Sequence, residues 1–227
     1  MKIVFEKFEN TLMIEPGKIS ILHINDHSLF SRCAYSLVQE YTADVFEPAA
    51  CFDDDNRELK IAESLFVVGD LLSFDLNDKR IVALAIKKLT SDIADEGSFQ
   101  GTLQEINLQM EEVFDGKFVQ MSANYAFLND WDVTKYLRMA GFGVDTDNDV
   151  TPFDKICHLL RIASDLFPGK AIALINLCTL LTQNQFDELC MLVASEQLMV
   201  LLYETDDRID FTHLDNRLFV DGDYVEY

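Results

Sequence analysis

The segment that follows the apolar run Ile19 to Ile24 is the first place where the sequence could do chemistry. In a nucleotide-binding α/β protein this segment is a phosphate loop, whose glycines let backbone N–H groups close around the phosphates. A Lys and a Ser or Thr of that loop contact the β/γ oxygens and magnesium. The stretch from His23 to Ser31 contains no glycine and no lysine. The sequence therefore favours an α/β scaffold without the nucleotide site over a working ATPase.

The sequence gives equally little support for other kinds of catalytic site. His23 and His27 are four residues apart, but the intervening residues lack the Glu of a zinc-protease helix. His158 falls within an apolar helical pattern, and His213 falls in a polar tail segment. No Ser or Cys has an identifiable base partner. We therefore expect no enzymatic activity.

Acidic clusters are the more informative polar feature. Asp145, Asp147 and Asp149 alternate as the first ligands of a calcium loop would, yet Val150 stands where that loop needs Gly and Ile156 where it needs Glu. This segment is therefore not an EF-hand.

Two further acidic groups could hold a hard cation. They are Asp130 with Asp132, at the start of a predicted helix, and the run from Asp53 to Asp55. For these groups and for the alternating aspartates, the alternative is a solvated loop or a carboxylate that caps a helix.

Basic residues are few, so their positions matter. Lys135 and Arg138 are three residues apart on one predicted helix, and Lys170 precedes a predicted strand. Two adjacent pairs, Lys79-Arg80 and Lys87-Lys88, mark another helix. Each could contact a phosphate or could be ordinary surface charge beside the abundant carboxylates. In a symmetric oligomer a few such residues per subunit would form a ring of positive charge.

The elements that must position these residues alternate between strands and helices, which predicts a parallel sheet flanked by helices. Apolar patterns predict strands at 2–8, 12–14, 19–24, 65–68, 171–177 and 198–203. Helical spacing predicts helices over 29–41 with Ser28 as the cap, 80–93, 152–166 and 185–194. A hairpin around Asp221-Gly222 ends the chain.

The character of the chain changes between residues 91 and 150, where helical patterns at 103–114 and 133–140 occur without a good strand. We interpret this segment as an all-helical insertion or leg. The predicted fold class is therefore α/β, with a parallel-rich head formed by residues 1–90 and 151–227 and a helical insertion at 91–150.

Composition limits the partners and the location. The chain of 227 residues has 18 Lys and Arg against 40 Asp and Glu, a net charge of −22, which argues against a surface that binds nucleic acid or anionic membrane everywhere. Five cysteines without a CxxC pair indicate a reduced compartment. Glu6 and Glu9 interrupt any signal peptide, and no run approaches a membrane span. We expect a cytoplasmic protein that does not associate with membranes.

The whole pattern resembles a family. The sequence is similar to the type II-A CRISPR-associated accessory proteins of spacer acquisition, the Csn-two family, which combine a degenerate P-loop NTPase-like head with a helical insertion. The similar stretches are MKIVFEKFENTLMIEPGKISILHI, ESLFVVGDLLSFDLND, KAIALINLCTLLTQNQFDEL and RLFVDGDYVEY. The most distinctive is DLLSFDLN, with Asp70, Phe74, Asp75 and Asn77 in the family-like arrangement.

The resemblance implies a function. It implies a non-catalytic homotetrameric ring that binds double-stranded DNA at free ends during CRISPR adaptation, the acquisition of new spacers in antiviral defence. It also implies calcium between the subunits, no bound nucleotide, and the CRISPR integrase and RNA-guided nuclease as partners.

The resemblance also suggests site residues. The acidic segment that holds calcium in relatives falls at Asn129, Asp130 and Asp132, although Lys135 stands where a carboxylate is expected. Arg138 falls on a basic channel position and Lys170 on a basic position before the later strand. We take Lys135, Arg138 and Lys170 as the predicted DNA-binding residues.

Two other classes of function stay open from the sequence. An acidic interaction protein or DNA mimic would gather its carboxylates on one continuous face. A working nucleotide hydrolase would release phosphate despite the missing loop residues. A DNA-binding ring instead needs carboxylates outside and Lys and Arg within.

Overall fold

The computed structural model describes residues 1–38, 47–127, 132–205 and 208–226 of the chain. The chain divides into two units. The first unit, here called the α/β unit, comprises Met1–Phe74 and Thr146–Tyr227, and the second, the helical unit, comprises Asp75–Asp145. Each unit is described by itself.

A five-stranded sheet forms the centre of the α/β unit, and all its neighbouring strands run parallel. Its order is β6-β7-β8-β3-β9. The strands are β3 (Lys18–Ile24), β6 (Leu65–Val68), β7 (Ala171–Ile175), β8 (Met199–Glu204) and β9 (Arg217–Val220). They are nearly continuous apolar runs, as expected for a parallel sheet covered on both faces. The predicted mixed α/β fold with a parallel sheet is confirmed.

One face of this sheet packs against α1 (His27–Val38) and a second sheet. The second sheet is antiparallel in the order β2-β1-β4-β5. Its strands are β1 (Lys2–Phe5), β2 (Leu12–Met13), β4 (Ala49–Phe52) and β5 (Glu58–Leu59). Alternate residues of the parallel strands, such as Leu22, Leu201 and Tyr203, point into this core.

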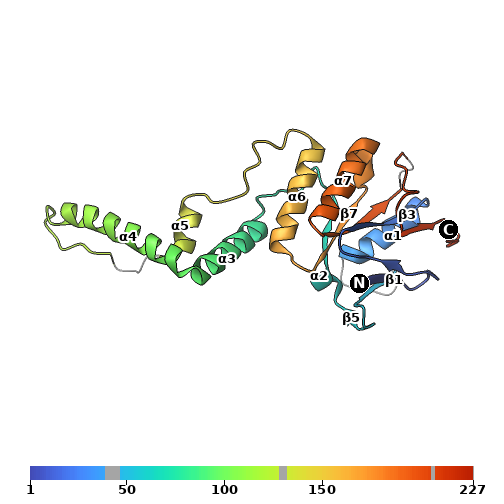
Figure 1. Cartoon of the computed structure of the whole chain (residues 1–227), viewed down its shortest axis with the longest axis horizontal. Coiled ribbons are helices and arrows are strands. Elements are labelled where there is room, and N and C mark those ends of the chain that lie inside the picture. The colour runs from blue at the N-terminus through green and yellow to red at the C-terminus, as the bar shows by residue number, and fades with distance from the viewer. Residues whose placement is uncertain (39–46, 128–131, 206–207, 227) are drawn as a thin grey trace. The chain divides into compact units, whose positions relative to one another are not determined.

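Two helices lie beside each other at the other face (Figure 1). They are α6 (Pro152–Leu166) and α7 (Gln183–Ser195), and α7 contacts β3. Both begin with a capping box, built on Thr151 with Asp154 and on Thr182 with Gln185. The short α2 (Ile61–Ser64) and the 3₁₀ turn η1 (Leu177–Leu180) complete this unit.

The end of the chain is tied to its beginning through one buried carboxylate. Glu47 is 3% exposed and accepts a 2.7 Å hydrogen bond from the Tyr224 hydroxyl. Lys7 and Arg32 lie 3.1 and 3.2 Å from the same oxygen of Glu47. Glu226 accepts the backbone N–H of Asn10 at 2.8 Å. The C-terminal segment is therefore held against the first sheet and α1.

The described residues of the helical unit form three helices, α3 (Lys79–Asp95), α4 (Gly97–Phe118) and α5 (Val133–Met139). α3 packs against both α4 and α5. Asp78 caps α3 by accepting the Arg80 N–H. α3 buries Ile81, Ile86 and Ile93, whereas neither α4 nor α5 has a fully buried residue.

Several details differ from the sequence-based expectations. The helical unit begins at Asp75 rather than at residue 91, because α3 packs with α4 and α5. Asp26, not Ser28, caps α1, since its carboxylate accepts the Leu29 N–H at 2.7 Å. The predicted C-terminal hairpin is reduced to one bridge between Val220 and Glu226. Strands β4 and β5 were not predicted.

None of the helices in the described part of the chain is long and apolar enough to cross a membrane.

Candidate nucleic-acid interface

Two of the predicted DNA-binding residues, Lys135 and Arg138, lie on the short helix α5, and both are exposed. The Asp132 carboxylate caps the helix by accepting the Thr134 N–H at 2.7 Å and the Lys135 N–H at 3.3 Å. The negative charge of Asp132 thus lies at the N-terminal end of the helix, where the helix dipole favours a carboxylate. The Asp132 cap therefore fixes where the helix that carries Lys135 and Arg138 begins.

The other end of α5 is set by Gly141, whose φ of 75° is in the left-handed region. The Phe142 N–H donates to the Leu137 carbonyl at 2.9 Å, and the Gly141 N–H donates to the Arg138 carbonyl at 3.3 Å. This turn ends α5. The residues after it lie near the start of α3, where the Asn77 side chain contacts Val144.

A groove of about 450 Å³ lies between α3 and the end of α5. Lys79 and Arg138 both line it, one from each helix. The remaining lining residues are Asn77, Val82, Ala83, Ile86, Gly141, Phe142 and Gly143. The structure thus brings together two basic residues that are far apart in the sequence.

Asn77 fixes one wall of this groove. Its side-chain amide donates to the Val144 carbonyl at 2.9 Å, and its amide oxygen accepts the Val144 N–H at 2.7 Å. A Cβ at Gly143 would lie 2.5 Å from that amide oxygen, so only glycine fits there without displacing the amide. Asn77 and Gly143 therefore act together as a clamp between the start of α3 and the segment after α5.

Lys170, the third predicted DNA-binding residue, belongs to the α/β unit. Its ammonium group donates a 2.9 Å hydrogen bond to the Ala62 carbonyl in α2. This contact ties the start of β7 to α2. Lys170 thus has a role within the fold that Lys135 and Arg138 do not have.

The basic residues of the two units differ in their surroundings. Six of the seven Lys and Arg residues of the helical unit form no ion pair and no side-chain hydrogen bond with described residues; only Lys88, with Asp92 at 3.3 Å, does. The six are Lys79, Arg80, Lys87, Lys117, Lys135 and Arg138. In the α/β unit most are engaged, for example Lys18 with Glu15 at 2.9 Å and Lys60 with Glu63 at 2.9 Å. The available cations are concentrated in the helical unit.

The predicted calcium ligands are only partly within the described chain. Asn129 and Asp130 lie outside the described residues. Asp132 uses one carboxylate oxygen to cap α5. Its backbone hydrogen bond with Lys135, together with those of Thr134, outweighs partial burial and lowers the pKa of Asp132.

Within the described residues, no three His, Cys, Asp or Glu side chains are grouped so that they could hold a metal ion. Of the alternating aspartates, Asp149 lies 3.1 Å from Nδ1 of His158. Asp53 accepts the N–H groups of Asp55 and Arg57 and so shapes its own loop. The described part of the chain alone does not fit a calcium ion.

The place where a phosphate loop would lie is occupied by the chain itself. The Asp26 carboxylate caps α1, and a Cβ at Gly222 would lie 3.2 Å from Cβ of Asp26. The segment after β9 therefore packs directly on this cap. A negative charge already sits at the N-terminal end of α1, where a phosphate would otherwise bind.

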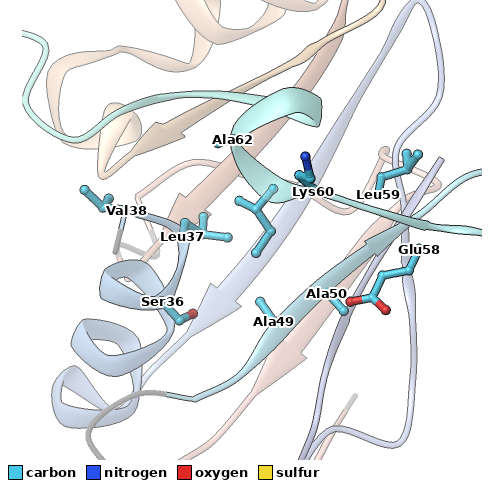
Figure 2. Close-up of a pocket in the computed structure, with 10 residues that line it drawn as sticks. Ser36, Leu37, Val38, Ala49, Ala50, Glu58, Leu59, Lys60 and Ala62 are labelled. Carbon is cyan, nitrogen blue, oxygen red and sulfur yellow. The ribbon is translucent and has the colours of Figure 1, made fainter. Parts of the chain in front are cut away.

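A second cavity, of about 370 Å³, lies in the α/β unit between the end of α1, β4, β5 and α2. Figure 2 shows its walls, with Leu37 and Val38 on one side and Ala49, Ala50 and Leu59 among the others. Its cation, Lys60, is paired with Glu63, and Glu58 also lines it. The lining residues of this cavity therefore include no unpaired cation.

Comparison with known proteins agrees with the resemblance in the sequence. The family model described as "CRISPR-associated protein (Cas_Csn2)" matches residues 41–224. The chain belongs to the Csn2 family. The Csn2 proteins of Streptococcus agalactiae and Enterococcus faecalis are similar to it, at 24% and 23% identity over 90% of this chain. The match covers 89% and 90% of those proteins, respectively.

A solved structure also shares the fold. The crystal structure of Stu0660 of Streptococcus thermophilus is similar with a TM-score of 0.60 and 13% identity. The similarity covers 97% of this chain and 74% of that one. The Csn2 family assignment predicted from the sequence is therefore confirmed.

Sequence reasoning missed the juxtaposition of Lys79 and Arg138. In the sequence, Lys79 and Arg80 stand out only as an adjacent pair on one helix. The packing of α3 against α5 cannot be predicted from the sequence pattern. The only sequence signal near this site is DLLSFDLN, which contains Asn77. The partner of Asn77, the segment Gly143-Val144, has no distinguishing sequence pattern.

Proposed function

We propose that this Csn2-family protein is a non-catalytic, ring-forming homotetramer that binds double-stranded DNA, preferentially at free ends, during spacer acquisition. Its α/β unit would be a degenerate relative of P-loop NTPases, and its helical unit would carry the DNA-binding residues. The integrase and the RNA-guided nuclease of a CRISPR system would be its partners, in the cytoplasm. The observation that carries the proposal is the set of six cations in the helical unit that form no ion pair with any residue the structure describes.

These cations support DNA binding despite the net charge of −22. Phosphate contacts dominate non-specific affinity for DNA, and they need Lys and Arg that are not neutralised by neighbouring carboxylates. Lys135 and Arg138 meet this condition and lie on one helix. Lys170, hydrogen-bonded to Ala62, is the weakest of the three proposed contacts.

The surface of α4 supports self-association. Along this helix the apolar residues Phe99, Leu103, Ile106, Met110 and Val113 are spaced by four and three residues in alternation, which we call the α4 stripe. Such spacing is typical of a helix that packs along another helix. Four of the five side chains are about half exposed or more, from 49% for Phe99 to 72% for Val113. A second copy of the chain is the partner that a ring requires.

The missing phosphate loop and the Asp26 cap support the absence of nucleotide hydrolysis. The described residues include a His–Asp contact, His158 with Asp149, but no described Ser or Cys is hydrogen-bonded to that histidine. Calcium remains a proposal that depends on Asn129 and Asp130 and on carboxylates of neighbouring subunits. Removal of Asp132, as Asp132→Asn, tests it through the calcium dependence of the native mass.

The test of the proposed function uses linear duplex DNA in a gel-shift assay at low salt, with and without calcium. We expect retardation that weakens steeply as salt is raised, because phosphate contacts release counterions. Native mass measurement under the same conditions should give a tetramer. Unretarded DNA in both conditions would overturn DNA binding, and a monomer in both would overturn the ring.

The acidic composition favours a second candidate, an interaction protein or DNA mimic that binds basic partners. The α/β unit carries eleven of the basic residues against 28 acidic ones. In that case the protein would bind a basic protein and would not retard DNA. The same gel-shift assay therefore separates the two candidates.

A further inference from the structure

The groove between α3 and the end of α5 combines two features that suit one kind of ligand. Lys79 and Arg138 line it, are exposed, and form no ion pair with described residues. No acidic residue is among the residues that line the groove, so its charge is positive. The two cations favour an anionic ligand.

The lining between the two cations is largely apolar. Val82, Ala83 and Ile86 contribute from α3, and Phe142 contributes an aromatic ring from the segment after α5. A simple inorganic anion would gain nothing from such a lining. A nucleotide would, because its base stacks on aromatic and apolar side chains while its phosphate contacts cations.

The groove is an open one of suitable size. Its volume of about 450 Å³ is within the range of small-ligand sites. The clamp formed by Asn77, Val144 and Gly143 fixes the backbone on one side. A base that is paired within a duplex cannot enter such a groove, whereas an unpaired base at a strand end can.

We propose that this groove binds the terminal nucleotide of a DNA strand, with its phosphate between Lys79 and Arg138 and its base on the apolar lining. The inference rests on the proposed function and adds to it a structural basis for the preference for DNA ends. Lys79 is thereby a binding residue, and Ala83, which is exposed and lines the groove, determines how much room the base has.

The test compares two duplexes of the same sequence by fluorescence anisotropy. One has a single-nucleotide 5′-phosphorylated overhang at each end, and the other is closed by hairpin loops at both ends. The variants are Lys79→Gln, which removes a cation, and Ala83→Phe, which fills the groove without changing charge. The matched control is Lys87→Gln, on the same helix, since Lys87 also forms no ion pair within the described chain but does not line the groove.

We expect the wild-type protein to bind the open duplex more tightly than the closed one. Both groove variants should reduce that ratio at least about fivefold, the effect of losing one stacked base or phosphate contact. Lys87→Gln should weaken both duplexes equally and leave the ratio unchanged. With the wild-type protein, dAMP should compete with the open duplex and not with the closed one.

The possible failures are distinguishable. If the variants keep DNA binding and the wild-type ratio, or dAMP does not compete, the groove proposal is wrong while DNA binding stands. If the wild-type protein binds neither duplex, both proposals are wrong. If the variants change the native mass and not the ratio, the groove is a contact between copies of the chain, which also overturns the proposal. Far-UV circular dichroism establishes that each variant is folded.

Discussion

The two units of this Csn2-family chain use their apolar residues in different ways. The α/β unit buries them between two sheets and three main helices, so that residues such as Phe5, Phe186 and Tyr203 are at most 2% exposed. Among the helices described in the helical unit, only α3 has buried residues, and four of the five residues of the α4 stripe are exposed. The first unit buries its apolar residues in a core of its own, whereas the second leaves an apolar stripe exposed, as surfaces that bind a partner commonly do.

The two units also differ in their use of charge. In the α/β unit, Glu47 gathers Lys7, Arg32 and Tyr224 at a single buried position. In the helical unit, six of the seven basic residues form no ion pair with a described residue, and the seventh, Lys88, pairs with the exposed Asp92. Most basic residues of the α/β unit therefore take part in contacts within the fold, whereas most basic residues of the helical unit are available to bind a ligand. The predictions below test this division.

The largest effect is expected in the core of the α/β unit. Phe186 is fully buried and packs edge-on against Phe211 with ring centroids 5.5 Å apart. We expect Phe186→Ala to lower the free energy of unfolding by about 3–5 kcal/mol, the usual cost of such a cavity. Urea unfolding followed by circular dichroism measures it.

The matched control lies in the helical unit. Met139 is 80% exposed, and Met139→Ala should change the free energy of unfolding by no more than about 0.5 kcal/mol. Equal destabilisation by the two substitutions would contradict the difference in packing between the units.

The next effect is expected on self-association through the α4 stripe. Ile106→Glu combined with Val113→Glu would place two unpaired carboxylates in a contact between copies. We expect the association to weaken more than about a hundredfold, which corresponds to about 3 kcal/mol. If the proposed tetramer forms, native mass measurement and light scattering should show smaller species for the double variant than for the wild-type protein at the same concentration.

Met191 provides the control in the α/β unit, because it is 64% exposed on α7 and lies outside the α4 stripe. Met191→Glu should leave the mass unchanged. If the double variant of α4 keeps the wild-type mass, self-association does not use this helix.

Much of the fold could be predicted because the parallel strands are continuous apolar runs and the helices carry strong periodicity. The strand at 65–68 has the predicted bounds, and the helix predicted after Pro152 ends at Leu166 as expected. Strands β4 and β5 were missed, since they are short and their residues, such as Ala49 and Glu58, have no strand pattern. The prediction of Ser28 as the cap of α1 was wrong, because Asp26, whose side chain caps helices equally well, takes that place.

The candidate site was less predictable for a different reason. The exposed cations Lys135 and Arg138 could be found because they share one helix, and i, i+3 spacing is visible in the sequence. Lys79 meets Arg138 only because α3 packs against α5, which no local pattern encodes. Lys170 resembled the other cations in sequence, and only the tertiary structure reveals its hydrogen bond to Ala62.

The third prediction concerns Glu47. Its burial alone would raise its pKa, but hydrogen bonds from Tyr224 and Lys7, and the charges of Lys7 and Arg32, outweigh burial and lower it. Because the folded-state pKa lies below the unfolded value near 4.5, this carboxylate stabilises the fold above about pH 4.5. That contribution is lost as the pH falls through the folded-state pKa.

We expect Glu47→Gln to lower the free energy of unfolding by about 1–3 kcal/mol at pH 7. The difference between the variant and the wild type should shrink as the pH falls below about 4.5. Urea unfolding at a series of pH values measures both. Glu112, an exposed carboxylate on α4, provides the control, and Glu112→Gln should follow the wild-type curve. A difference for Glu47→Gln that grows at low pH would contradict the role of its charge.

The smallest effect separates two arginines that are alike except for their unit. Arg138 in the helical unit and Arg161 in the α/β unit are both exposed, and neither forms an ion pair with described residues. If DNA contacts the helical unit, Arg138→Gln should weaken duplex binding by about fivefold, or about 1 kcal/mol, and lower the salt slope by about one. Arg161→Gln should leave both unchanged, because that cation would face no phosphate.

Anisotropy titrations between low and moderate salt provide both the duplex affinity and its salt slope. Equal losses for the two arginines would mean that DNA responds only to the net charge of the chain, and the division of binding between the units would then be wrong.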